Sequence, residues 1–238
     1  MKIIDFLFPK YCINCSQKWE YLCPQCKKKL IPHPEICPYC HTYSKFYQTC
    51  FGCKNKSNSH LKWLIIGFSY DQTLKNLIFR LKYFHKKHIS EFLAQRLFLV
   101  IQTNQILNYQ INVLKQKIFI SYVPSHRYRK YFVKWYNPSK EIAKLLADKL
   151  NLECIDIVQK TKHTRQQVWL SKIQREKNLK SIFKVKQSAI KQIQWNEIII
   201  VVDDVTTTWA TINEISQTIQ AMYPQTSIRW AVLWRHNS

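Results

Sequence analysis

The residues best placed for chemistry are Asp203 and Asp204, which stand between an apolar run and a turn rich in hydroxyl groups. The run, residues 197–202, is rich in β-branched side chains that do not alternate with polar ones. It therefore predicts a strand buried on both faces, as in a parallel sheet. The turn, residues 206–211, leads into a helix with an apolar stripe. This order puts two carboxylates and a helix N-terminus at one end of a strand.

The turn and the carboxylates predict a ligand with two kinds of polar group. Backbone N–H groups and threonine hydroxyls at a helix N-terminus favour a phosphate. Asp203 and Asp204 can accept hydrogen bonds from ribose hydroxyls, or hold a metal ion that does, so a sugar phosphate satisfies both ends. The alternative is structural: the aspartates keep a strand end soluble and a threonine caps the helix. The cap is then Thr208, or Thr211 with Glu214 in a capping box.

The same stretch resembles the loop that binds phosphoribosyl pyrophosphate (PRPP) in type I phosphoribosyltransferases. In that family an apolar strand and two acidic residues precede Thr-Thr-Gly-Ala-Thr. The resemblance implies that Asp203 and Asp204 are catalytic and that Mg²⁺ accompanies PRPP. It assigns the phosphate to six residues: Thr206, Thr207, Thr208, Trp209, Ala210 and Thr211. Trp209 departs from the pattern, because the family has a glycine there that would allow a positive φ.

Eight of the nine cysteines form Cys-x-x-Cys pairs near the N-terminus: Cys12 and Cys15, Cys23 and Cys26, Cys37 and Cys40, Cys50 and Cys53. One pair supplies two thiolates to a tetrahedral metal ion, and two pairs complete a site, so the sequence predicts two zinc ions. Disulfides are the alternative, which a cytoplasmic location disfavours. The spacing does not decide which Cys-x-x-Cys pairs share a metal ion, so sequential and interleaved arrangements both stay open. Cys154 is expected to be a small buried residue.

Beyond a polar linker at residues 54–60, the pattern changes to alternating strands and helices. Strands are expected at 63–70, 117–123, 153–158, 182–185, 197–202 and 227–233. Helices are expected at 74–81, 88–102, 138–150 with Ser139 as N-cap, and after the threonine-rich turn, whereas 104–116 is expected to be loop. The alternation predicts an α/β fold, a mostly parallel sheet with helices on both faces and ligands at the carboxyl ends of the strands.

The chain is expected to have two domains. Residues 1–58 would form a small cysteine-rich zinc-binding domain, which cannot bury a core of its own and depends on its metals. Residues 59–238 would form the phosphoribosyltransferase-like domain. Two of its stretches, 123–137 and 164–178, are strongly basic and predict a site for pyrophosphate, although each could be a solvated loop. The cations predicted to bind the pyrophosphate are Arg127, Arg129, Lys130, Arg165 and Arg175.

These segments together resemble the ComF family of competence-associated, phosphoribosyltransferase-like proteins. That family has an N-terminal zinc region, a Val-Pro…Arg…Arg-Gly-Phe-Asn-Gln motif, a Thr-x-x-Gln-x-Gly-Leu-Ser-x-x-x-Arg-x-x-Asn motif and a PRPP loop, in this order. The third motif is matched by Gln167, Leu170, Ser171, Arg175 and Asn178. In the second motif Lys134, Tyr136 and Pro138 replace Arg, Phe and Gln. The resemblance implies PRPP binding and a role in natural competence, with single-stranded DNA and other DNA-uptake proteins as partners.

Tryptophan occupies three positions where the family motifs have glycine, namely Trp135, Trp169 and Trp209. The chain has 2 Gly and 8 Trp, while an average content of about 7% would give roughly 17 glycines. We interpret this as a sign of UGA codons that the source cell reads as glycine, and Trp19 and Trp63 also stand where a turn glycine would be natural. The alternative is a non-catalytic homologue with a degenerate loop, which would bind nucleic acid while keeping the fold.

The formal net charge is +23, which predicts a polyanionic partner, and nucleic acid is the first candidate. A solvated lysine-rich surface without a partner is the alternative. No run of 18 apolar residues occurs, so membrane insertion is not expected. The first ten residues lack a cleavage site of the secretory type, which favours a cytoplasmic location.

Overall fold

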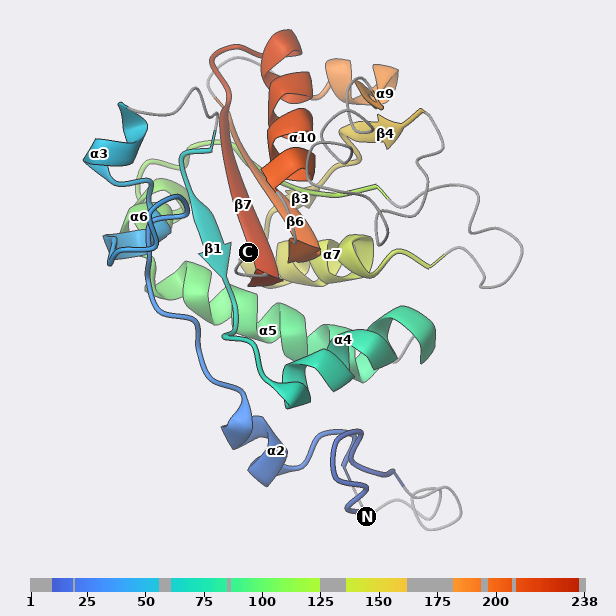
Figure 1. Cartoon of the computed structure of the whole chain (residues 1–238). Coiled ribbons are helices and arrows are strands. Elements are labelled where there is room, and N and C mark those ends of the chain that lie inside the picture. The colour runs from blue at the N-terminus through green and yellow to red at the C-terminus, as the bar shows by residue number, and fades with distance from the viewer. Residues whose placement is uncertain are drawn as a thin grey trace.

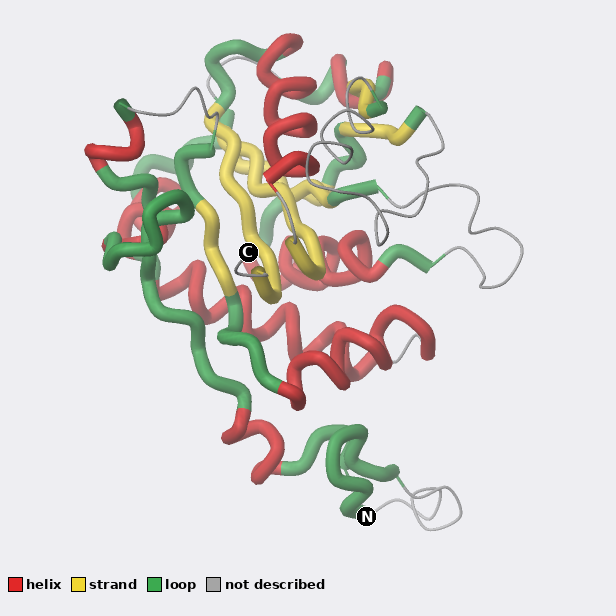
Figure 2. Tube along the Cα trace, viewed as in Figure 1, coloured by secondary structure: helices red, strands yellow, loops and turns green. Residues whose placement is uncertain are grey.

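The computed structural model describes residues 10–18, 20–55, 61–84, 87–124, 136–161, 182–193, 197–206 and 209–235 (Figure 1, Figure 2). Its centre is a five-stranded sheet in the order β1-β7-β6-β2-β3, and every neighbouring pair is parallel. The strands are β1 (Leu64–Ile66), β2 (Ile118–Tyr122), β3 (Glu153–Cys154), β6 (Ile198–Thr206) and β7 (Ser227–Arg235). The mostly parallel α/β fold expected from the sequence is confirmed.

Strand β6 is the middle strand of the sheet and carries the two aspartates. Residues 198–202 are all buried, as expected for a strand covered on both faces. In register, Ile200 of β6 lies opposite Ile120 of β2 and Arg229 of β7. The polar end of β6 therefore emerges at the centre of the carboxyl edge of the sheet.

Helices cover both faces of the sheet (Figure 1). Their bounds are α4 (Gln72–Phe84), α5 (Lys87–Thr103), α6 (Gln105–Asn112), α7 (Pro138–Leu150), α9 (Gln187–Ile190) and α10 (Trp209–Met222). The connections from β1 to β2 and from β2 to β3 run one way across the sheet, whereas the connection from β6 to β7 runs the other way. Because such crossovers are right-handed, α5 and α7 pack on one face and α10 lies on the other.

Three expectations about elements need correction. Within the loop expected at 104–116, residues 105–112 form α6, and Asn104 caps this helix by accepting the backbone N–H of Leu107 at 3.1 Å. The strand expected at 63–70 shortens to β1, and the strand at 153–158 divides into β3 and β4 (Val158–Lys160). Strand β4 pairs antiparallel with β5 (Phe183–Val185) in a separate two-stranded sheet. The split lets the chain leave the main sheet after β3.

In the cysteine-rich N-terminal part, the described residues form short elements: α2 (Pro24–Lys29), the 3₁₀ turn η1 (Lys45–Tyr47) and α3 (Phe51–Lys54). It joins the sheet-and-helix part through the backbone bridges Pro32–Phe68 and Gln48–Trp63. Three of its apolar side chains, Leu22, Leu30 and Tyr47, belong to the continuous core. Packing against the larger part therefore supports this segment in addition to any metal. The domain boundary at residue 58 falls outside the described residues and stays a prediction.

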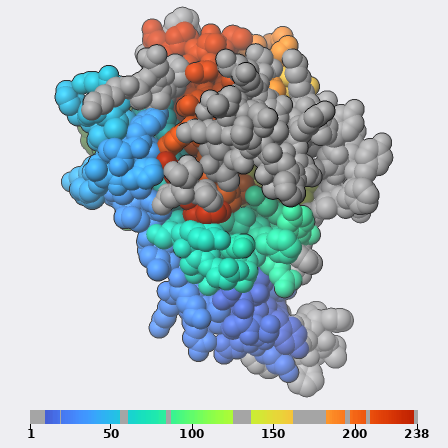
Figure 3. All heavy atoms as spheres, in the orientation of Figure 1, coloured from blue at the N-terminus to red at the C-terminus, as the bar shows by residue number. Residues whose placement is uncertain are grey.

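The space-filling view shows the first cysteine-rich stretch at the bottom of the molecule and the second on its left flank (Figure 3). The two stretches thus contact different sides of the sheet-and-helix part. Within the described ranges, every helix is too short or too polar to cross a bilayer.

Candidate functional site

Asp203 and Asp204 stand near the end of β6 and are held by groups from three elements. The hydroxyl of Ser139, in the first turn of α7, donates to Asp203 Oδ1 at 2.9 Å, and so does the backbone N–H of Asp204. The ammonium of Lys82, near the end of α4, lies 2.9 Å from Asp204 Oδ2. The backbone N–H of Val205 donates to Asp204 Oδ1 at 2.8 Å. This arrangement fixes both carboxyl groups before any ligand is present.

The two carboxyl groups sit in unlike electrostatic surroundings. Burial, followed by the charge of Asp204, raises the pKa of Asp203 to about 8, although Ser139 and Lys82 act in the opposite direction. Lys82 is in direct contact with Asp204. A ligand that brings hydroxyl donors or a cation to Asp203 would favour its charged form. The site can therefore gain a proton acceptor when such a ligand arrives.

Sequence reasoning missed Lys82 and misassigned Ser139. Asn137 is the N-cap of α7, because its Oδ1 accepts the backbone N–H of Lys140 at 3.3 Å, and Pro138 takes the first helical position. The hydroxyl of Ser139 is therefore not needed to cap the helix, and it donates to Asp203 instead. The signal was the Asn-Pro-Ser sequence itself, since asparagine before a helical proline is a good cap.

Trp209 is the first residue of α10, and it is not among the described residues with a positive φ. Its ring stacks on Tyr39 with centroids 5.2 Å apart and an interplanar angle of 20°. The guanidinium carbon of Arg235, at the end of β7, lies 4.2 Å from the Trp209 ring centroid. Arg235 also donates to the carbonyl of Pro38 at 2.6 Å and to His41 Nε2 at 2.8 Å. The second cysteine cluster is thus attached to the N-terminal turn of α10.

The structure describes some, but not all, of the other residues predicted to bind the phosphate. Thr206 is buried at the end of β6 and pairs in register with Arg235. Ala210 and Thr211 lie in the first turn of α10, so Thr211 is not the cap that the capping-box alternative required. Thr207 and Thr208 lie outside the described residues.

The predicted pyrophosphate cations also lie outside the described residues, and their roles stay predictions. These cations are Arg127, Arg129, Lys130, Arg165 and Arg175. The chain enters the first basic stretch just beyond β2, where the N–H of Val123 donates to the carbonyl of Val202 at 3.0 Å. That stretch therefore begins beside the strand that carries the aspartates. Trp135 and Trp169 are likewise not described.

Eight cysteines gather into two groups of four, and the pairing is sequential: Cys12, Cys15, Cys23 and Cys26 form one group, and Cys37, Cys40, Cys50 and Cys53 form the other. Within each group all four sulfur atoms lie within 4.8 Å of one another. Zinc bound at about 2.3 Å from each sulfur would place tetrahedral sulfurs about 3.8 Å apart. The Sγ separations of 3.5 Å for Cys15–Cys23 and 3.6 Å for Cys40–Cys50 fit that geometry.

The two cysteine groups are repeats of one backbone plan, which was not expected from the sequence. In each group the N–H of the third cysteine donates to the sulfur of the first, at 3.5 Å for Cys23 and 3.4 Å for Cys50. Ser16 and His41, which directly follow the second cysteine, both adopt a positive φ near 60°. The constant offset of 25 residues between the first two cysteines of each group was the available signal. We call these two segments, residues 12–26 and 37–53, the first and the second ribbon. In each ribbon the thiols are already arranged for one metal ion.

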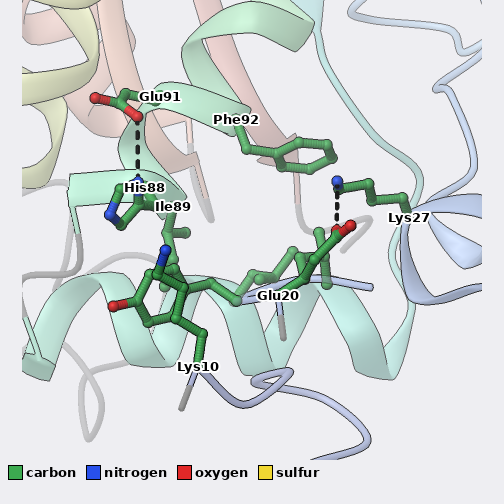
Figure 4. A pocket seen from close by; sticks show the side chains of 10 residues that line it. Lys10, Glu20, Lys27, His88, Ile89, Glu91 and Phe92 are labelled. Carbon is green, nitrogen blue, oxygen red and sulfur yellow. Dashed lines mark hydrogen bonds and ion pairs between the residues drawn. The ribbon is translucent and has the colours of Figure 1, made fainter. Parts of the chain in front are cut away.

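The first ribbon meets the helices α4 and α5 around a cavity of about 360 Å³ (Figure 4). Its wall includes Tyr21, stacked on His88 at 4.7 Å, and the ion pair between Glu20 and Lys27 at 3.1 Å. Among the described residues, none of those predicted to bind PRPP lines this cavity. It is an interface between the first ribbon and the helices, separate from the aspartate site.

Comparison with known proteins identifies the family. No family model matches the chain. Competence protein F of Haemophilus influenzae is 30% identical over 217 residues, which cover 89% of this chain and 91% of that protein. The two cysteine groups agree with the double zinc ribbon expected at the N-terminus. Given identity at this level over nearly the full length of both proteins, the chain belongs to the ComF family.

Proposed function

We propose that this chain binds PRPP, or a closely related sugar phosphate, at the carboxyl end of β6 and acts as a phosphoribosyltransferase or as an enzyme-like binder. The observation that carries the proposal is the pair Asp203 and Asp204, fixed at the centre of a parallel sheet directly before a helix. Ligands of open α/β sheets bind at this edge. The supporting groups, Lys82 and Ser139, would keep the two carboxyl groups in place.

The residues have distinct roles in this proposal. Asp203 and Asp204 accept hydrogen bonds from the ribose hydroxyls, and the turn at residues 206–211 binds the 5′-phosphate. Cations of the two basic stretches, Arg127, Arg129 and Lys130 with Arg165 and Arg175, steady the pyrophosphate. Mg²⁺ bound with PRPP supplies charge neutralisation of the leaving group. Holding the two reactants in one geometry would supply much of any rate enhancement.

Calorimetric titration with PRPP and Mg²⁺ tests this function. The double substitution Asp203→Asn with Asp204→Asn should weaken binding by about ten-fold or more, because hydrogen bonds to charged groups contribute roughly 1.5–3 kcal/mol each. Asp148→Asn, an exposed carboxylate on α7, is the matched control and should leave the affinity unchanged. Equal affinity of the double variant and the control would contradict the proposal.

A second function is proposed from the charge and from the relative. The relative is named a competence protein, and this chain carries a net charge of +23. We propose that the chain acts in natural competence, in the cytoplasm, by binding single-stranded DNA through phosphate contacts, together with other DNA-uptake proteins. Binding to an oligonucleotide should be micromolar or weaker and fall steeply with salt, since each neutralised phosphate adds about 0.7 to the log–log slope. An affinity independent of salt would overturn this second function.

A further inference from the structure

A second cavity, of about 550 Å³, opens beside the aspartate site, between the second ribbon and the carboxyl ends of β1 and β7. Its chemistry-bearing lining residues are His33, His41, Ser69, Tyr70, Trp234 and Arg235. The site is adjacent to the predicted PRPP loop through the strand register, because Trp234 pairs with Val205 and Arg235 pairs with Thr206. A ligand in this cavity therefore lies one strand away from β6.

One wall of the cavity is aromatic. Tyr70 and Trp234 stack with ring centroids 4.4 Å apart and an interplanar angle of 25°. Tyr70 keeps 52% of its surface exposed although its ring is stacked against Trp234. Aromatic platforms of this kind recognise flat rings by stacking, and every nucleobase has such a face.

The same cavity is also lined by His33 and His41, whose neutral rings offer one hydrogen-bond acceptor and one donor. His33 Nδ1 lies 2.8 Å from the carbonyl of Pro34, so Nδ1 carries a proton. Burial lowers the pKa of His33, which favours the neutral ring and leaves Nε2 as an acceptor. His41 Nε2 must accept from Arg235, which has only donors, so the proton of His41 is on Nδ1. Arg235 is already bonded to Pro38 and His41 and lies over Trp209. Because these contacts already occupy the guanidinium of Arg235, it is a poor partner for a phosphate in this cavity.

We propose that this cavity, which we call the Tyr70 pocket, binds a nucleobase. A flat ring with donors and acceptors along its edge matches a cavity lined by an aromatic pair, a neutral donor and a neutral acceptor, and the volume is typical of pockets for small molecules. The base can come from a free base or nucleotide, or from a DNA strand. If PRPP binds at the carboxyl end of β6, as proposed above, a free base bound in this pocket is the phosphoribosyl acceptor.

Equilibrium binding to the zinc-loaded full chain tests the Tyr70 pocket. The probes are the five free bases, their nucleoside monophosphates, a twelve-residue oligothymidylate and an abasic strand of the same length. Tyr70→Ala should weaken base binding about ten-fold or more, which is the usual scale of a lost base–aromatic stack. Tyr70→Phe keeps the ring and should bind normally. Tyr109→Ala removes an equally exposed tyrosine, 53% against 52%, from α6 and should also bind normally.

The probes separate the two sources of the base. Binding of free bases or monophosphates that depends on Tyr70 assigns the pocket to a small molecule. Binding of the oligothymidylate alone, dependent on Tyr70 and absent for the abasic strand, assigns it to DNA. Base binding that is absent, or that Tyr70→Ala leaves unchanged, overturns the proposal.

Photo-crosslinking of 5-bromouracil ligands to the wild-type chain gives a second readout, which stands even if Tyr70→Ala fails to fold. Adducts are expected on the peptides that contain Tyr70 or Trp234, and adducts confined to other peptides would overturn the proposal. PRPP titration on the same proteins distinguishes this failure from failure of the proposed function. Base binding without PRPP binding keeps the pocket and rejects PRPP, whereas the reverse keeps PRPP and rejects the pocket.

Discussion

Tyr39 and Trp209 stack face to face at 5.2 Å, and this contact joins the second cysteine ribbon to the first residue of α10. Tyr39 lies between two cysteines of the ribbon, in the sequence Cys37-Pro-Tyr-Cys40. The position of its ring therefore depends on how those thiols are held. Because α10 begins at Trp209, within the predicted phosphate-binding turn of residues 206–211, a metal ion in the second ribbon would help to position that turn. The first ribbon has no such contact among the described residues.

Removal of zinc should therefore affect the two ribbons differently. We expect the purified chain to carry close to two zinc ions, and chelation to unfold residues 10–55 while the sheet-and-helix part stays folded. Loss of the second metal should also release Tyr39 and change the fluorescence of Trp209. Metal analysis and fluorescence during titration with a chelator are the measurements, and freshly reduced protein without zinc would refute the metal sites.

Paired variants separate the two ribbons. The double variant Cys37→Ser with Cys40→Ser should lose one zinc ion and change the fluorescence of Trp209. The part of the signal that belongs to Trp209 is the part that Trp209→Phe removes. Cys12→Ser with Cys15→Ser is the matched control, and it should lose one zinc ion while leaving that signal unchanged. The same fluorescence change in both variants would show that Tyr39 does not couple the second ribbon to α10.

Lys82 should stabilise the folded chain through Asp204. Lys82→Met removes the ammonium 2.9 Å from Asp204 Oδ2 and leaves that buried residue without its cation. We expect the free energy of unfolding to fall by about 1–3 kcal/mol. Lys75→Met, at an exposed position of the same helix, should change it by less than about 0.5 kcal/mol. Urea unfolding followed by circular dichroism measures both, and equal effects would mean that the ion pair contributes nothing.

The parts of the site that follow the chain were predictable, and those that depend on packing were not. The burial of β6 and the start of α10 directly after the threonines follow from local pattern. The cysteine spacing predicted two metals, but the sequential pairing required the positions of the sulfurs. In the sequence Lys82 resembles the other lysines of a solvated surface, because the sequence of its own helix does not indicate that its side chain faces the end of β6. Tyr39 and Arg235 meet Trp209 from positions far apart in sequence.

Helix α6 was missed for a different reason. Residues 105–112 contain Ile106, Leu107, Tyr109 and Ile111, but their spacing shows no clear helical period, and the cap signal of Asn104 was not used. The missing period outweighed the capping residue in that assignment. A cap before a short stretch is therefore better support for a helix here than periodicity alone.

The raised pKa of Asp203 predicts a stability that depends on pH. Its pKa of about 8 in the folded chain exceeds the value of about 3.9 for an unfolded aspartate. Between these values the folded state binds more protons, so the free energy of unfolding falls as pH rises, by up to about 1.4 kcal/mol per unit. The contribution of the neutral carboxyl group is complete below the unfolded pKa and is lost as pH rises through the folded pKa.

Asp203→Asn removes this titration while keeping an oxygen to accept from Ser139. The stability advantage of Asp203→Asn over the wild type should therefore grow from pH 6 to pH 8 and then level off. Urea unfolding of the zinc-loaded proteins at a series of pH values is the measurement. Asp148→Asn, exposed on α7, should give a curve parallel to the wild type. A parallel curve for Asp203→Asn would mean that the pKa of Asp203 is not raised.

The identity of residue 209 can be decided in the source cell. If UGA is read there as glycine, peptides of the native protein should contain glycine at positions 135, 169 and 209. Mass spectrometry of protein isolated from that cell makes the measurement. An intact Trp209 peptide would reject the codon interpretation and leave a loop that diverged from the family.

Substitution of Trp209 tests whether its ring weakens PRPP binding while its contacts with the second ribbon stabilise the fold. Trp209→Gly should bind PRPP more tightly, more so with Trp135→Gly and Trp169→Gly, because an indole beside the 5′-phosphate adds bulk where N–H donors are needed. It should also lower the free energy of unfolding by roughly 2 kcal/mol, since the stack on Tyr39 and the cation–π contact with Arg235 are both lost.

Two controls separate these effects of Trp209→Gly. Tyr39→Ala removes the stack but keeps the indole, so it should lose stability without gaining affinity for PRPP. Asp203→Asn with Asp204→Asn, introduced into the Trp209→Gly chain, should abolish the gain, because the ribose hydroxyls lose their charged acceptors. Calorimetry with Mg²⁺ and PRPP measures the affinity and urea unfolding measures the stability. If the wild-type chain and the Trp209→Gly variant bind PRPP equally, the indole does not obstruct the phosphate, and the aromatic contact with Tyr39 holds Trp209 clear of the ligand.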